Sequence, residues 1–159
     1  MPTLTTPDAS KMTRAWALWD QLERGLNALQ PLAALLARLY VAQVFFLSGL
    51  TKLRDWDITL ALCADEYHVP LLSPQVAAML GTAGELVLPV LLVLGLAGRF
   101  AALGLSMVNV VAVLALAEIA PAALQQHITW GLLLGALVLY GCGPWSLGAA
   151  IRRRVTLRT

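Results

Sequence analysis

Charge is scarce in this chain. Only 13% of its 159 residues are Asp, Glu, Lys or Arg, whereas 59% are hydrophobic, and the mean hydropathy is +0.76. An ordinary soluble domain has about a quarter charged residues and about half apolar ones. The composition therefore excludes a soluble domain and predicts an integral membrane protein with one domain.

Cysteine and histidine are equally rare, with two of each, and no CxxC, HExxH, P-loop or GxGxxG motif is present. We expect Cys63 and Cys142 on opposite sides of the membrane, which excludes a disulfide between them. His68 and His127 are both expected at the outer surface, so haem bound between spans is not expected. No His, Met or Cys has ligand spacing, and we predict no permanent metal site; transient copper contact stays open.

Long apolar runs are what the chain does contain. Each run is close to the length that crosses the roughly 30 Å hydrocarbon layer as a helix. They do not alternate as membrane strands do. The sequence therefore predicts an all-α membrane protein, a four-transmembrane-helix bundle. The four runs are Leu32–Leu53, Gln75–Leu96, Arg99–Ala117 and Ile128–Cys142.

The N-terminal segment is expected to be neither a span nor a secretory signal, because the apolar core begins only at Leu32. Apolar residues recur there every three or four positions, as in a helix lying at the membrane interface. They are Met12, Trp16, Trp19, Leu22 and Leu26. We divide the chain into 1–31 (tail and interfacial helix), 32–147 (four-helix domain) and 148–159 (basic tail).

Basic residues predict the orientation. The two tails and the loop between spans two and three hold most of the Lys and Arg, and the positive-inside rule then places both termini in the cytoplasm. The tail IRRR is interpreted as an orientation signal and a headgroup anchor, and no nucleic-acid partner is expected. The residues are Lys11, Arg14, Arg24, Arg99, Arg152, Arg153, Arg154 and Arg158.

The segment Arg54–Pro74 then faces outward. Its sequence predicts a short surface helix with an Asp cap, an apolar stripe at Ile58, Leu62 and Cys63, and a stop at Pro70. Anchoring at the interface is the simpler role for its aromatic residues. The alternative is that Glu66, Tyr67 and His68 form the roof of a site beneath them.

Three polar residues share one predicted depth. At about 1.5 Å per residue, Gln43, Glu85 and Asn109 each lie roughly 15–16 Å into their spans. Three separate polar side chains facing lipid at the midplane would be costly. We therefore expect them to meet inside the bundle, where a carboxyl group in apolar surroundings can exchange its proton with a ligand.

Side-chain direction selects the partners of this group. Helical side chains lean toward their own N-terminus, so Lys52 and Glu85 approach each other from opposite ends of the membrane. His127 and Trp130 share a face at the outer mouth of span four. Arg38 leans the other way, and we expect it to extend to the inner surface. The alternative is that all these side chains only hold the bundle together by hydrogen bonds.

The sequence resembles the DoxX family of small four-span bacterial membrane proteins. The resemblance lies in ARLYVAQVFFLSGLTKL, EYHVPLLSP, GTAGELVLPVLLVLGLAGRFAALGL, QHITWG and GPWSL, in this order. The family pattern usually follows GPWSL with Asp, where this chain has Gly148. The sequence is most similar to a branch of this family that is encoded beside metal-binding peptides and their modifying enzymes.

The resemblance implies a bacterial inner-membrane protein in a redox or in a metal- or oxidant-stress system. If it has any catalytic role, the resemblance implies an accessory subunit of a membrane oxidoreductase. We expect it to bind a quinone-like molecule or a partner protein in the outer half of the bundle. A proton-coupled transporter and a structural scaffold are the alternatives. Small residues such as Gly131 and Gly135 suit close helix contact, and the sequence leaves monomer and homodimer open.

Overall fold

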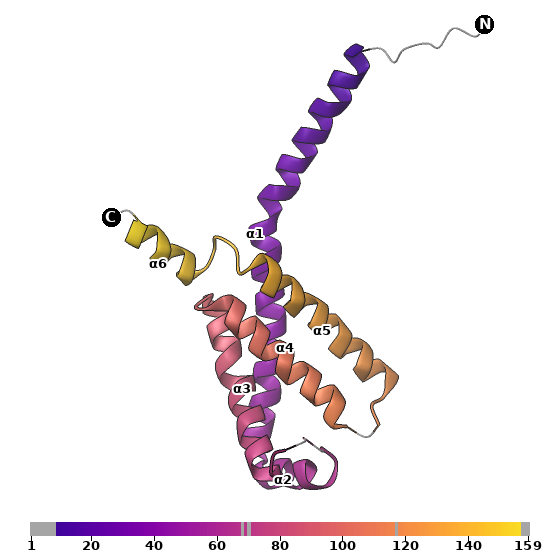
Figure 1. Ribbon diagram of the computed structural model, residues 1–159, viewed down its shortest axis with the longest axis vertical. Coiled ribbons are helices and arrows are strands. Elements are labelled where there is room, and N and C mark those ends of the chain that lie inside the picture. Colours follow the sequence, from indigo (N-terminus) through magenta and orange to yellow (C-terminus); the bar gives the residue numbers. More distant parts are fainter. Residues whose placement is uncertain (1–8, 68, 70, 117, 157–159) are drawn as a thin grey trace, which may run out of the picture.

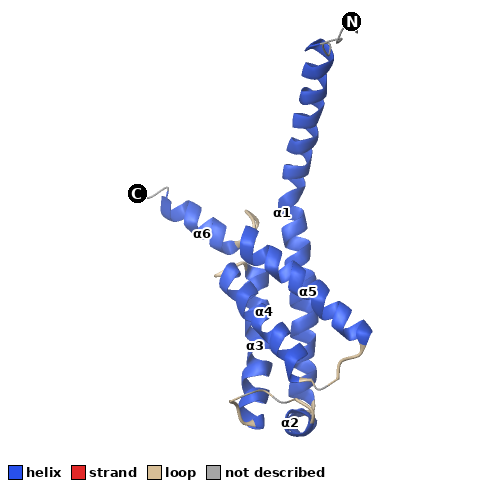
Figure 2. Cartoon of the chain, turned by 45° about the vertical axis from the view of Figure 1, so that its right-hand side comes forward, coloured by secondary structure: helices blue, strands red, loops and turns tan. Residues whose placement is uncertain are grey.

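The computed structural model describes residues 9–67, 69, 71–116 and 118–156, and these ranges contain helices and no strand (Figure 1). Figure 2 shows the same helices from a second direction. Four of them are long and apolar enough to cross a membrane, which confirms the predicted all-α, four-span architecture. The helices are α1 (Ala9–Arg54), α2 (Trp56–Asp65), α3 (Pro74–Leu94), α4 (Gly98–Ala115), α5 (Pro121–Tyr140) and α6 (Leu147–Thr156).

Helix α1 has two parts that differ in their contacts. The part before Pro31 projects away from the other helices, and the first buried residue of α1 among those described is Arg38 (Figure 1). With 46 residues at about 1.5 Å each, α1 extends about 69 Å, more than twice the hydrocarbon thickness. The helix continues through Pro31, because alanine and leucine on both sides favour helix and proline removes only one hydrogen bond.

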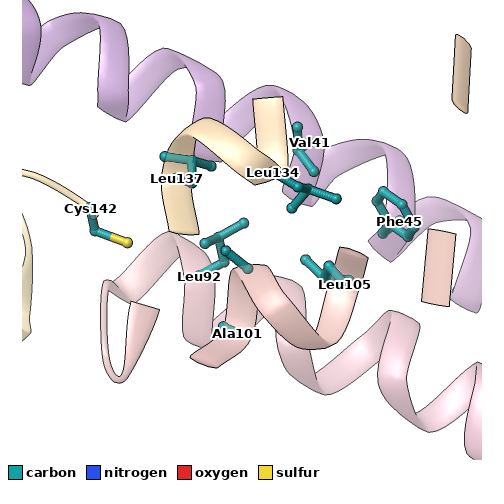
Figure 3. Packing of buried hydrophobic residues seen from close by; sticks show 9 residues of the cluster. Val41, Phe45, Leu92, Ala101, Leu105, Leu134, Leu137 and Cys142 are labelled. Carbon is teal, nitrogen blue, oxygen red and sulfur yellow. The ribbon is translucent and has the colours of Figure 1, made fainter. Parts of the chain in front are cut away.

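The core lies where the four spans meet. Helix α1 packs against α3 and α5, α3 packs against α4, and α4 packs against α5. Each span contributes a fully buried side chain to this centre: Val41, Leu92, Leu105 and Leu134 (Figure 3). In lipid, close packing rather than escape from water holds such helices together.

The bundle has two ends. The α2 end contains α2, the end of α1, the start of α3 and the connection from α4 to α5 (Figure 1). The α6 end contains α6, the end of α5 and the turn from α3 to α4. In that turn, Gly95 takes the left-handed backbone conformation, with φ of +66°, which ends α3 and reverses the chain.

Several helix boundaries differ from the sequence expectation. Asp55 stands at the N-cap of α2, but its side chain makes no capping hydrogen bond. Helix α2 ends at Asp65, well before Pro70. The apolar run begins at Ile128 and the fourth span was expected to start near Leu124, but helix α5 begins at Pro121, because proline fits the first helical turn and the alanines after it favour helix. Gln125 and Gln126 in the second turn interrupt the apolar run.

Candidate ligand-binding site

An ion pair joins α1 to α3 near the α2 end. The Lys52 ammonium donates to Glu85 Oε1 at 2.6 Å, and the Glu85 side chain is only 6% exposed. Gly49 permits this approach, because an added Cβ would lie 3.1 Å from the Glu85 Cβ. Pro89, one turn beyond Glu85 in α3, cannot donate to the Glu85 carbonyl, so the helix hydrogen-bond ladder is interrupted at the site. The predicted approach of Lys52 and Glu85 from opposite ends is present in the structure.

A cavity of about 290 Å³ adjoins this pair, between α2, α3 and α4. Apolar side chains such as Leu80, Met107 and Val111 form most of its wall. Glu85 Oε2 is buried and has no hydrogen-bond partner. Glu85 is thus one of the few polar residues that line the cavity, and the structure shows one oxygen of its carboxyl group without a partner among the described residues. This combination of a mainly apolar lining and few polar groups is typical of small-molecule sites.

Helix α2 forms one wall of this cavity. Thr59 donates to the carbonyl oxygens of Lys52 and Asp55, each at 3.0 Å, and so fixes α2 to the end of α1. Tyr67 and Cys63 line the cavity. Of the predicted roof, Tyr67 is therefore in place, Glu66 lies exposed beside it, and His68 falls outside the described residues.

Burial changes the acidity of two groups in this roof. Desolvation raises the pKa of the Cys63 thiol, with the nearby Lys52 charge acting in the opposite direction. Desolvation also raises the pKa of the Tyr67 hydroxyl, and the Glu66 charge adds to the increase. Both groups are therefore neutral at pH 7, and the thiol is not activated as a nucleophile.

A second polar group joins α4 to α5. The Asn109 amide donates to the His127 carbonyl at 3.0 Å, and its Oδ1 lies 2.8 Å from His127 Nδ1. Since the amide nitrogen faces a carbonyl, Oδ1 must face the imidazole, and His127 carries its proton on Nδ1. Both ends of the Asn109 amide are thus satisfied, and neither Asn109 nor His127 lines the cavity.

Aromatic contacts extend this second group to α1. The rings of His127 and Trp130 meet edge to face at 4.9 Å, and Trp130 meets Phe45 at 5.9 Å. The Trp130 indole also donates to the Tyr40 hydroxyl at 3.4 Å. The sequence analysis expected Asn109 and His127 to join Glu85 in one group. They form instead, with Trp130, a cross-tie between helices that is separate from Lys52 and Glu85.

Gln43 joins neither group. It is exposed and lies in a surface groove between α1 and α3, beside Pro89 and Val90. Gln43 and Lys52 are nine residues apart, which is about half a rotation around a helix with 3.6 residues per turn. Gln43 lies at the predicted depth along α1. However, its side chain is on the opposite side of the helix from Lys52, and not in the bundle interior where it was expected.

Arg38 is fully buried at the α6 end. Its Nη2 donates to the Trp145 carbonyl at 2.7 Å. We had expected this side chain to extend to the inner surface, and that expectation is wrong because the segment after α5 folds over it. Arg38 and Glu85 do not form a pair.

Sequence reasoning missed Cys63, Thr59 and Met107 as cavity residues. Thr59, Leu62 and Cys63 share one face of α2 at helical spacing, and this signal could have identified the lining. The predicted apolar stripe contained Leu62 and Cys63, which line the cavity, but it also contained Ile58, which is 60% exposed, and it omitted Thr59. Among the described residues, no three His, Cys, Asp or Glu side chains gather as a metal site would require.

Comparison with known proteins identifies the family. The DoxX family model matches residues 33–118, which is more than half of the chain and includes Lys52, Glu85 and Asn109. The match ends before α5, so His127, Trp130 and the GPWSL segment lie outside it. Neither a curated protein nor a solved structure matches the chain. With four apolar helices and this match, the chain is a multi-pass membrane protein that belongs to the DoxX family.

Proposed function

We propose that this protein binds a small, mainly apolar molecule with a carbonyl or hydroxyl group, such as a quinone head group, in the cavity beside Glu85. The observation that carries the proposal is the buried Glu85 Oε2, which has no partner while Oε1 holds Lys52. A protonated carboxyl can donate to a carbonyl oxygen, and an ionised one can accept from a hydroxyl. Lys52 keeps the carboxyl group oriented in either state.

The size of the cavity supports a single ring rather than a large ligand. Its volume of about 290 Å³ is at the lower limit of typical ligand pockets. The apolar wall would surround the ring, while Glu85 would fix its polar group. Asn109, His127 and Trp130 would support the binding residues by holding α4 and α5 in place.

In the cell, the proposed role is an inner-membrane component of a redox or of a metal- or oxidant-stress system, with the α2 end facing the periplasm. The distribution of basic residues supports this orientation, and membership of the DoxX family supports the setting. Reporter fusions to the C-terminus and to residue 118 test the orientation. A periplasm-active reporter at the C-terminus would overturn it.

Filling the cavity tests the binding proposal. Gly81 lines the cavity, and an added Cβ meets no atom within 4 Å, so Gly81→Val should fill the space and leave the fold intact. Gly135 also has room for a Cβ but lies away from the cavity, which makes Gly135→Val a matched control. The probe is a short-chain benzoquinone titrated into the purified protein in nanodiscs, with binding followed by calorimetry.

We expect binding by the wild type and the Gly135→Val variant, and a loss of at least about tenfold in affinity for Gly81→Val, since about 1.4 kcal/mol gives a factor of ten. Equal affinity in all three proteins would place the quinone elsewhere. No binding by the wild type would favour a partner protein or a scaffold.

A further inference from the structure

Arg38 is a buried cation for which the described residues provide no counterion. Its side chain has no exposed surface, and its Nε and Nη1 have no hydrogen-bond partner. Arginine does not lose its proton in proteins, so the charge must be compensated in another way. Among the described carboxylates, Glu85 is held by Lys52, and Asp20 and Glu23 lie on the projecting part of α1.

An open hollow of about 620 Å³ lies beside Arg38, between the α3–α4 turn, the end of α5 and α6. Gly95 and Ser146 line it. An added Cβ on Gly95 would come within 2.8 Å of Arg38 Nη1. The unpaired guanidinium therefore lies next to Gly95, a residue of the hollow's wall.

The hollow itself is basic. Arg99 and Arg152 line it from α4 and α6, and its lining contains no carboxylate. Arg99 donates one bond to the Leu139 carbonyl at 3.2 Å and keeps other N–H groups available. Helix α4 begins here at Gly98 without a side-chain cap, and its first residues, whose N–H groups have no partner within the helix, line the hollow.

We propose that this hollow binds a phosphate-bearing anion, and that the anion compensates the charge of Arg38. Two arginines at the rim, a helix N-terminus and a buried guanidinium behind the wall together create a positive field suited to phosphate. The ligand is either the headgroup of an anionic phospholipid or free phosphate. The position at the end of three membrane spans suits a headgroup, since basic pockets between spans bind such lipids.

The test compares two charge-matched double variants of the full-length protein. Arg99→Gln with Arg152→Gln removes the rim charges, whereas Arg153→Gln with Arg154→Gln removes two exposed charges from the same helix, outside the lining. Native mass spectrometry measures retained phosphatidylglycerol against phosphatidylcholine with the same acyl chains. Thermal unfolding in inorganic phosphate against chloride at equal ionic strength measures the free anion. The rim variants are used because they leave Arg38 and its hydrogen bond to the Trp145 carbonyl in place.

We expect the wild type and the α6 control to prefer phosphatidylglycerol, and the rim variant to lose about thirtyfold in affinity, based on about 1 kcal/mol for each arginine. Stabilisation by inorganic phosphate that disappears only in the rim variant would identify free phosphate as the ligand. Equal losses in both double variants would show general charge attraction and overturn the site. No preference for phosphatidylglycerol together with no effect of phosphate would also overturn it.

Discussion

Lys52 and Arg38 lie about four turns apart on the same side of α1, but their charged groups have different partners. Lys52 meets the carboxylate of Glu85 beside an apolar cavity. Arg38 meets only the Trp145 carbonyl and keeps two donor atoms without a partner. The comparison shows that a cation on this face of α1 can be paired with a carboxylate or left without one among the described residues. What matters is which polar atom is left unsatisfied: at the α2 end it is an acceptor or proton donor, and at the α6 end it is a cation.

The largest effect should follow from breaking the ion pair. Lys52→Met leaves the Glu85 carboxyl group buried without its partner, and we expect a loss of about 2 kcal/mol in unfolding free energy. This value is between those for buried and exposed pairs, because Lys52 is partly exposed. Steric-trapping measurements in bicelles check the loss. A double-mutant cycle with Glu85→Met should recover a coupling of similar size, and additive effects would show that the pair contributes no stability.

The same substitution at Arg38 should act in the opposite direction. Arg38→Met removes a buried charge that has no counterion, so we expect stabilisation of about 1 kcal/mol in neutral detergent without phosphate. Adding anionic lipid should reduce this advantage, because the wild type then gains a counterion. Thermal unfolding of both proteins in the two media checks it. A loss of stability in neutral detergent would show that the Trp145 hydrogen bond outweighs the unpaired charge.

The Asn109–His127 cross-tie should affect stability more than binding. Asn109→Ala removes two hydrogen bonds between α4 and α5, and interhelical bonds in membranes contribute about 0.6–2 kcal/mol. We therefore expect a loss of about 1 kcal/mol with quinone affinity within about twofold of the wild type. Calorimetry of the same preparation checks both values. A tenfold loss of affinity would move Asn109 from support to the ligand site.

The smallest effect concerns the acidity of Cys63. Because burial raises its pKa, the rate of maleimide labelling should rise at higher pH than for a cysteine peptide, and it should be slow at pH 7. The Lys52 charge lowers this pKa, so Lys52→Met should move the labelling profile further toward high pH. Stopped-flow labelling in a Cys142→Ala background measures the profile. A profile that matches the peptide would mean that Cys63 is not shielded in the cavity.

The sequence was sufficient for the fold and for one part of the site. Long apolar runs and few charges require helices that satisfy their own backbone in lipid, and the leaning of side chains along a helix was sufficient to predict the Lys52–Glu85 contact. Depth alone was not sufficient for Gln43, because residues at one depth can face opposite sides of a helix. The rotation about the helix axis between the two positions would have placed Gln43 on the opposite side of α1 from Lys52.

The burial of Arg38 could not be predicted, because it depends on how the segment between α5 and α6 folds over α1. Pro144 and the left-handed Gly141 and Gly143 shape that segment, and its path is a tertiary property that no helical period records. The cavity wall formed by α2 was missed for a similar reason. The sequence analysis selected Ile58 as a buried residue of α2 because it is hydrophobic. The buried residue is Thr59, whose hydroxyl donates to the Lys52 carbonyl at the end of α1.

The most direct test of the central claim is infrared difference spectroscopy of the carboxyl group when a short-chain benzoquinone is added. A quinone at Glu85 Oε2 should perturb the carboxyl or carboxylate bands of the wild type. The perturbation should vanish in Glu85→Gln and remain in Glu118→Gln, because Glu118 is exposed and lies outside the cavity. Quinone binding with no carboxyl perturbation, or with one that persists in Glu85→Gln, would contradict the account.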